Sequence, residues 1–315
     1  MNLMLYDNCC ICPRNCGVDR NKSTGYCGEG AELRLAFAGL HSGEEPPLSG
    51  EKGSGTIFVS GCNMRCHTCQ NWQISGGVSN ENVLGRVVST EEFIKICLEL
   101  QKMGAENINI VTGSHVVPAI AQKLKAAKIN GLTIPVVWNS SGYEKPETLE
   151  LLDGLVDIWL PDLKTLDKKV AATIFKAPDY PEIACAAIHC MIKNNKTIIR
   201  HLILPGKLEA TKEVLRWIAF LSENYAAGTF QLSLMTQYTP ILGEIKKVPG
   251  TFLNGTFLSD AFLSEREYDT VMGWLNEFGI DEGFCQELVT GSDWLPDFRR
   301  KNPFSSSLSV PVWHY

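Results

Sequence analysis

The chain has 315 residues and a formal net charge of −6 at pH 7. Hydrophobic residues make up 44% of it and charged residues 20%, a composition typical of a globular protein with one large core or two smaller ones. The acidic balance argues against nucleic acid as a partner, because binding nucleic acid needs a basic surface to neutralise phosphates. No apolar run approaches the roughly 20 residues of a membrane span, so we expect no membrane partner.

The first residues, Met1–Asp7, carry no basic side chain and only a short apolar stretch, so we expect no signal peptide. A cytoplasmic protein is therefore expected, in a reducing compartment where grouped cysteines bind metals rather than form disulfides. Four of the twelve cysteines are scattered and are predicted to be structural, namely Cys97, Cys185, Cys190 and Cys285.

Five cysteines crowd into residues 9–27, among turn-forming prolines and glycines. Four thiolates from this set would make a closed metal site, either a zinc site or a second iron–sulfur cluster. The alternative is a loop of unligated thiols. We assign residues 1–49 to a Cys-rich N-terminal extension whose candidate ligands are Cys9, Cys12, Cys16 and Cys27, with Cys10 surplus.

After residue 54, apolar runs and helix-like segments alternate. The runs predict parallel strands covered on both faces, at Thr56–Ser60, Asn107–Thr112, Ile134–Asn139, Val156–Pro161, Thr197–Leu204 and Phe230–Met235. Helices are expected from Ser89, through Val116–Lys128, over Lys212–Glu223 and after Ser264. Ser89 with Glu92, and Ser264 with Glu267, match the capping-box pattern of a helix start.

Six strand–helix units predict an α/β protein with a partial (β/α)6 barrel over residues 50–285, followed by a C-terminal extension over residues 286–315. Right-handed crossovers place the helices outside such a barrel. The active site of a barrel of this kind lies at the carboxyl ends of its strands, in the loops that lead to the helices.

Cys62, Cys66 and Cys69 directly follow the first predicted strand. Three thiolates at this spacing can hold three irons of a cubane cluster and leave the fourth iron open for a small molecule. A structural zinc site normally has four ligands, and His67 is poorly placed to be the fourth because it lies between two of the cysteines. The spacing therefore favours a cluster.

The stretch Gly61–Asn71 resembles the signature of radical S-adenosylmethionine (SAM) enzymes. The resemblance implies a [4Fe–4S] cluster at the three cysteines, with SAM bound to the open iron. It also implies an anaerobic oxidoreductase that cleaves SAM to a 5′-deoxyadenosyl radical, which abstracts hydrogen from a substrate. The electron would come from a one-electron reductant such as flavodoxin or ferredoxin.

Polar residues at the ends of the second and third predicted strands are candidates for cofactor binding. Thr112, Gly113 and Ser114 look like the loop that binds the amino group of SAM in the superfamily. Asn139 and Ser140 form a polar cluster that directly follows an apolar strand.

The fourth and fifth predicted strands add charged candidates. Asp162 and Lys164 lie in an Asp-Leu-Lys run that resembles the element contacting the methionine carboxylate in enzymes that activate glycyl-radical proteins. Arg200 and His201 interrupt an apolar strand, and because burying an unpaired polar group is costly, one of them should face the barrel interior with a partner. We place Arg200 among the cofactor-binding residues.

Over roughly residues 9–280 the chain is similar to the pyruvate formate-lyase-activating-enzyme-like (PflX-like) family. Shared runs include Cys12–Arg20, His41–Pro47 and Arg200–Gly206. The resemblance implies a radical SAM enzyme that acts on a protein or peptide, in the manner of a glycyl-radical-enzyme activase. Two alternatives stay open, a radical SAM enzyme that modifies a small metabolite and a non-catalytic iron–sulfur protein of electron transfer.

Overall fold

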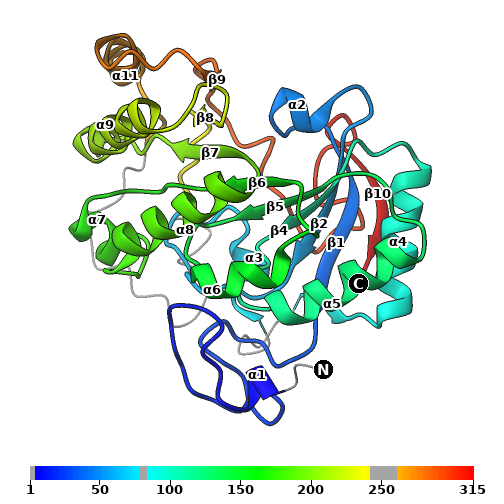
Figure 1. Cartoon of the computed structure of the whole chain (residues 1–315). Helices are drawn as coiled ribbons and strands as arrows, with labels where there is room; N and C mark the ends of the chain where they lie inside the picture. The colour runs from blue at the N-terminus through cyan, green and yellow to red at the C-terminus, as the bar shows by residue number, and fades with distance from the viewer. Residues whose placement is uncertain (1–3, 78–83, 242–260) are drawn as a thin grey trace.

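A computed structural model describes residues 4–77, 84–241 and 261–315. A ten-stranded sheet runs through the molecule in the order β10-β1-β2-β4-β5-β6-β7-β8-β9, with β3 paired to β1 (Figure 1). From β2 onward along this order the strands are parallel, whereas β1 is antiparallel to β2, β3 and β10. The strands are β1 (Arg34–His41), β2 (Ser54–Val59), β3 (Arg86–Val87), β4 (Ile108–Val111), β5 (Val136–Ser140), β6 (Ile158–Pro161), β7 (Lys196–Leu202), β8 (Phe230–Met235), β9 (Gly283–Cys285) and β10 (Ser309–His314).

Helices connect the parallel strands and cover the outer face of the sheet (Figure 1). The longer ones are α4 (Thr90–Lys102), α5 (Val117–Ile129), α8 (Tyr180–Asn194), α9 (Leu208–Asn224) and α11 (Glu265–Glu277). Short ones are α1 (Met4–Asp7), α2 (Pro46–Ser49), α3 (Trp72–Ser75), α6 (Pro146–Leu149), the 3₁₀ turn η2 (Glu150–Leu152) and α7 (Lys168–Thr173). None of the described helices is long and apolar enough to cross a bilayer.

This is the expected α/β fold, a mostly parallel sheet curved into a partial barrel that does not close. All six predicted strands are confirmed, as β2, β4, β5, β6, β7 and β8. The sequence analysis missed β1 and α8, and the helix predicted from Lys212 begins earlier, at Leu208. Since β1 and β10 come from the flanking segments, the sheet extends beyond the predicted barrel residues; the division into three parts stays a prediction.

Both predicted helix starts are present, but only one is a complete capping box. The Ser264 hydroxyl accepts from the Glu267 amide, and the Glu267 carboxylate in turn accepts from the Ser264 amide. Ser89 accepts from the Glu92 amide in the same way. The Glu92 carboxylate instead binds Arg86 and the indole of Trp313, which ties α4 to the C-terminal strand.

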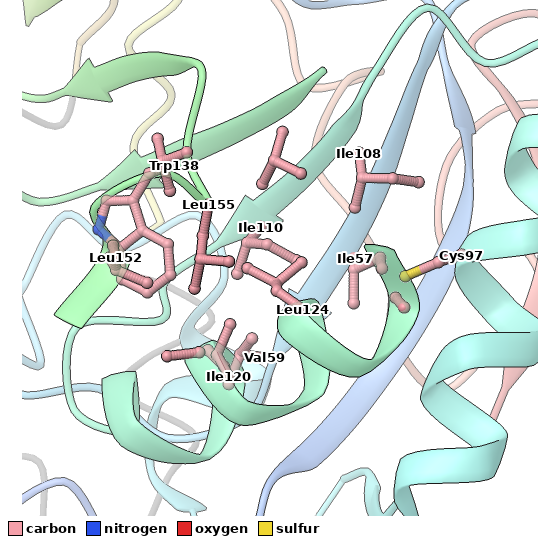
Figure 2. Packing of buried hydrophobic residues seen from close by; sticks show 14 of the residues in the cluster. Ile57, Val59, Cys97, Ile108, Ile110, Ile120, Leu124, Trp138, Leu152 and Leu155 are labelled. Atoms are coloured by element: carbon pink, nitrogen blue, oxygen red, sulfur yellow. The ribbon is translucent and has the colours of Figure 1, made fainter. Parts of the chain in front are cut away.

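The largest apolar cluster lies between the outer face of the sheet and helices α4 and α5. Figure 2 shows Ile57, Ile110 and Trp138 from the strands meeting Ile120 and Leu124 of α5. These side chains are at most 3% exposed. Burying one such side chain contributes about 1.5–3 kcal/mol, so this layer anchors the strands that carry the site.

The inner face of the sheet surrounds the barrel lumen, and short α2 closes its amino-terminal end. The Asn107 side chain, just before β4, donates to the Leu48 carbonyl over 2.8 Å. Leu48 then packs on the inward side chains of β5, β6 and β7, which are Val137, Leu160 and Ile198. These apolar side chains fill the amino-terminal end of the lumen, and the polar residues lie nearer the carboxyl ends of the strands.

Candidate active site

The three cysteines after β2 lie on a loop at the carboxyl end of that strand. The Cys62 sulfur accepts from the Met64 amide at 3.4 Å, and the Cys69 amide donates to the Cys66 carbonyl at 3.4 Å. Burial raises the pKa of the Cys69 thiol to about 12, with a further increase from Cys62 and an opposing effect of the Lys164 ammonium. Burial likewise raises the pKa of Cys66, again opposed by Lys164. The loop therefore brings the three thiols together beside the cation of Lys164.

That cation belongs to a charged network across β5, β6 and β7. The Lys164 ammonium is 2.6 Å from one Asp162 oxygen, and the Arg200 Nε is 3.1 Å from the other. Arg200 Nη2 also donates to the Asn139 side-chain oxygen over 2.7 Å. Although burial acts in the opposite direction, Lys164 and Arg200 together lower the pKa of Asp162. Four predicted cofactor residues are thus assembled in one place.

The structure also shows which polar residue of β7 faces inward. Arg200 points into the lumen, while its neighbour His201 points outward, where Nδ1 lies 2.7 Å from the Leu163 carbonyl and Nε2 lies 3.0 Å from the Thr211 hydroxyl. Burial lowers the pKa of His201 to about 4, so a neutral ring links β7 to α9. Both residues have partners, as the cost of burial requires.

Backbone groups around Asp162 and Lys164 are fixed by the buried Tyr180 of α8. Its hydroxyl lies 2.7 Å from the Asp162 carbonyl and 2.8 Å from that of Ser141, and it accepts from the Lys164 amide over 2.9 Å. One hydroxyl thereby joins the chain after β5 to the chain after β6. The sequence analysis missed this contact because it also missed α8.

The remaining predicted cofactor residues lie at the ends of β4 and β5. Thr112 has a left-handed backbone with φ of 66°, and its amide donates to the Asn139 carbonyl at 2.9 Å. Gly113 is pressed against Trp138, whose ring would lie 2.4 Å from any β-carbon there. The loop is thus held close to β5 by its backbone.

The hydroxyls of Ser114 and Ser140 bind a buried carboxylate that the sequence analysis did not single out. Ser140 Oγ donates to Glu144 over 2.7 Å, and the indole of Trp138 donates to the other Glu144 oxygen over 2.7 Å. Burial raises the pKa of Glu144, while the hydrogen bonds from Trp138, Ser140 and Ser114 lower it. These two serine side chains therefore shape the loops, and their contact with a cofactor stays a prediction.

A cavity of about 440 Å³ opens beside the charged network, along β7, β8 and β9. Its wall includes Glu44, Arg200, Ser233, Gln237 and Phe284. The Gln237 carbonyl accepts from the side chain of Gln70, so one wall residue of the cavity contacts the residue that follows Cys69. Its dimensions suit a small molecule or a few residues of a peptide.

Glu44 lines this cavity and contacts Arg200. Its carboxylate is 3.3 Å from Arg200 and its side chain is 9% exposed. Burial raises the pKa of Glu44 to about 7, against the opposing effect of Arg200 and with a further increase from Glu45. Only the tertiary structure brings residues 44 and 200 together.

The N-terminal cysteines also gather, at the carboxyl end of the barrel beside the loop of Cys62. Cys9, Cys12 and Cys27 are buried, Cys16 is half-buried and Cys10 is exposed. Burial raises the pKa of Cys12 to about 11, and the thiols of Cys27 and Cys9 add to the shift. Within residues 4–77, 84–241 and 261–315, no three Cys, His, Asp or Glu side chains stand close enough to share one metal ion.

An inward charged network and a three-cysteine loop lie at the carboxyl ends of the strands of a partial barrel, where enzymes of this architecture have their active sites. The model of the radical SAM superfamily matches residues 56–218, which cover β2 to most of α9. The chain belongs to the radical SAM superfamily.

Among known proteins, the chain is 32% identical over 238 residues to the uncharacterized protein MJ0674 of Methanocaldococcus jannaschii, a match covering 75% of this chain and 67% of the relative. The fold resembles that of HydG, a maturase of the [FeFe]-hydrogenase, with a TM-score of 0.51, 13% identity, and coverage of 76% and 51%. A domain of a pyruvate-formate lyase-activating enzyme from Bacteroides vulgatus has a TM-score of 0.38, 15% identity, and coverage of 54% and 91%.

The superfamily implies a [4Fe–4S] cluster and SAM, and the residues of the structure fit both. Thiolates are the usual ligands of such clusters, and Cys62, Cys66 and Cys69 are three thiols on one loop. Lys164, whose ammonium acts on Cys66 and Cys69, offers a charge-assisted contact to a carboxylate beside them. The assignment of individual residues to SAM stays a prediction.

Proposed function

We propose that this protein is an activase-like radical SAM enzyme that removes a hydrogen atom from a protein or peptide. When bound, the cluster and SAM supply the reductive cleavage and the hydrogen-abstracting radical. The observation that carries the proposal is the cavity beside the Asp162–Lys164 pair, because it offers a substrate a place next to the cofactor residues.

The side chains of the site have different roles. Cys62, Cys66 and Cys69 would hold the cluster, and Lys164 would bind the carboxylate of SAM. Asp162 keeps Lys164 and Arg200 charged and oriented, since it contacts both.

The edge of the sheet favours a peptide as substrate. Among the described residues, β9 is the last strand at its end of the sheet, and Gly283, Phe284 and Cys285 of β9 line the cavity. An edge strand leaves backbone amides and carbonyls that an extended peptide can pair with, and nearby pockets can then select its side chains. A flexible segment of a partner protein could enter the cavity in this way.

A deuterium-transfer assay tests the proposal against the small-metabolite alternative. Cells are grown in deuterated medium, and their extract is separated by ultrafiltration into a protein fraction and a metabolite fraction. Each fraction is added to reconstituted protein with SAM and flavodoxin or ferredoxin as reductant. We expect the protein fraction to transfer deuterium into 5′-deoxyadenosine. Transfer from the metabolite fraction alone would contradict the proposal.

A further inference from the structure

The N-terminal extension has only a small apolar core. Apart from α1, the described residues before β1 form no helix or strand, and their buried apolar cluster consists of Tyr6, Cys9 and Ile11. Segments this small usually need a disulfide or a metal to hold one conformation. Every cysteine of the extension is a free thiol, so the structure has no disulfide there.

Two sulfurs of the extension, those of Cys16 and Cys27, converge on the turn at Gly25. A β-carbon built on Gly25 would stand 3.2 Å from the Cys16 sulfur and 3.5 Å from the Cys27 sulfur. The Cys16 sulfur also lies 3.9 Å from the Cys9 carbonyl. Cys12 is buried as well, whereas Cys10 is exposed.

The cysteines of the extension resemble Cys62, Cys66 and Cys69 in one respect. Four thiolates bound to one zinc at about 2.3 Å each would stand within about 4 Å of one another. In the described part of the chain no three potential ligands are placed to hold one metal ion, and this holds for Cys62, Cys66 and Cys69 as well. The superfamily assigns those three to a cubane, in which each thiolate binds a different iron. The four cysteines of the extension are thus compatible with a cubane as well.

A buried cation faces the extension's thiols. Arg20 is 3% exposed, its guanidinium stacks on the Tyr6 ring, and its Nη1 is 3.9 Å from the Cys9 sulfur. It also donates to the carbonyls of Glu29 and His115. A buried guanidinium is stabilised by a nearby anion, and a cluster held by four thiolates would supply one.

The extension is in direct contact with the loop of the three cysteines. The Cys27 carbonyl accepts from the Cys62 amide over 3.3 Å, which joins one cysteine of each set. Arg14 donates to the Asn63 carbonyl over 2.6 Å, next to the same position. Whatever binds the extension's thiols therefore lies beside the site of the first cluster.

We propose that Cys9, Cys12, Cys16 and Cys27 bind a second iron–sulfur cluster, adjacent to the cluster of Cys62, Cys66 and Cys69. The second cluster holds the extension against the carboxyl end of the barrel. The adjacency of the two clusters rests on the proposed function, since it presumes the first cluster. The four-cysteine site itself does not.

Metal analysis of cysteine variants tests the site. After anaerobic reconstitution we expect about eight irons in the wild type, about four in the variant with Cys62, Cys66 and Cys69 all changed to Ala, and about four in the variant with Cys9, Cys12, Cys16 and Cys27 all changed to Ala. Cys10→Ala and Cys285→Ala are the matched controls and should keep about eight. Loss of all iron from the triple variant, or about one zinc in place of iron, would overturn the proposal.

Two further measurements guard against misfolding and against failure of the proposed function. Should the quadruple variant not fold, Cys16→Ser alone should still alter the iron content and the visible spectrum, and an unchanged spectrum would count against the site. Electron paramagnetic resonance of reduced wild type should show two interacting clusters, against one isolated signal in each multiple variant. Two non-interacting signals in the wild type would refute their adjacency. Neither measurement needs SAM turnover, so both are independent of catalysis.

Discussion

The two sides of the barrel lumen are filled in opposite ways. Beside β1 and β2 the rings of Phe37, Phe58, Phe298 and Phe304 pack together, with centroids between 5.3 and 6.3 Å apart. Beside β6 to β9 the lumen holds the Glu44–Arg200–Asp162–Lys164 network and the cavity. The chain therefore fills one side of an open barrel with its own C-terminal segment and keeps the other side polar for ligands.

The largest expected effect lies on the aromatic side. Phe298→Ala removes a fully buried ring from the cluster and should lower the free energy of unfolding by about 3–5 kcal/mol. Because this ring is not part of the cavity wall, the SAM affinity of the folded protein should stay unchanged. Chemical denaturation measures the first quantity and calorimetry the second. Phe220→Ala, at a half-exposed position on α9, is the control. A large loss of affinity in Phe298→Ala would break the division between the two sides.

The next effect lies on the polar side. Asp162→Ala leaves two cations, Lys164 and Arg200, without the carboxylate that both contact. Breaking such a pair from one side costs about 3 kcal/mol of stability. Cofactor affinity should fall as well, because the ammonium loses its orientation. Denaturation and titration with SAM measure both, with exposed Asp153→Ala as the control. Unchanged stability would show that the network does not hold this side of the barrel.

The sequence predicted the strands of the barrel better than the contacts of the site, for physical reasons. Apolar strand runs such as Val136–Ser140 can be recognised in the sequence because burial on both faces of the sheet requires apolar residues. Alternation along β7 required one of Arg200 and His201 to face inward but could not choose between them. The Glu44–Arg200 contact joins residues 156 positions apart, and no local pattern encodes it. Glu144 is only four positions from Ser140, but the residue pattern gives no sign that this carboxylate is buried.

The pH dependence of stability sharpens the description of the cavity. Burial raises the pKa of Glu44 to about 7 from an ordinary 4.5. Between these values the native state binds more protons than the unfolded state, so stability falls as the pH rises through this window. Glu44→Gln cannot ionise and should flatten this decline by about 2–3 kcal/mol. Parallel stability curves for Glu44→Gln and wild type from pH 4.5 to 7 would rule out a buried, ionising Glu44.

The smallest effect concerns cofactor affinity alone. Lys164→Ala should weaken SAM binding through the loss of one charge-assisted contact, worth about 1.5–3 kcal/mol or roughly ten- to a hundredfold. Iron content should not change, because Lys164 is not a cluster ligand. Lys168→Ala, whose side chain is exposed and pairs with Glu182, should leave both quantities unaltered. Equal affinity in wild type and Lys164→Ala would remove Lys164 from the SAM site.

Reductive cleavage of SAM tests most directly the claim that the polar side of the lumen, beside the cluster loop, is a radical SAM site. Anaerobically reconstituted protein is mixed with SAM and a strong one-electron reductant, and 5′-deoxyadenosine and methionine are quantified by mass spectrometry. We expect slow, equimolar formation of both without any substrate, and none from the variant with Cys62, Cys66 and Cys69 changed to Ala. An intact, reducible cluster that yields no 5′-deoxyadenosine would contradict the account and favour an electron-transfer protein.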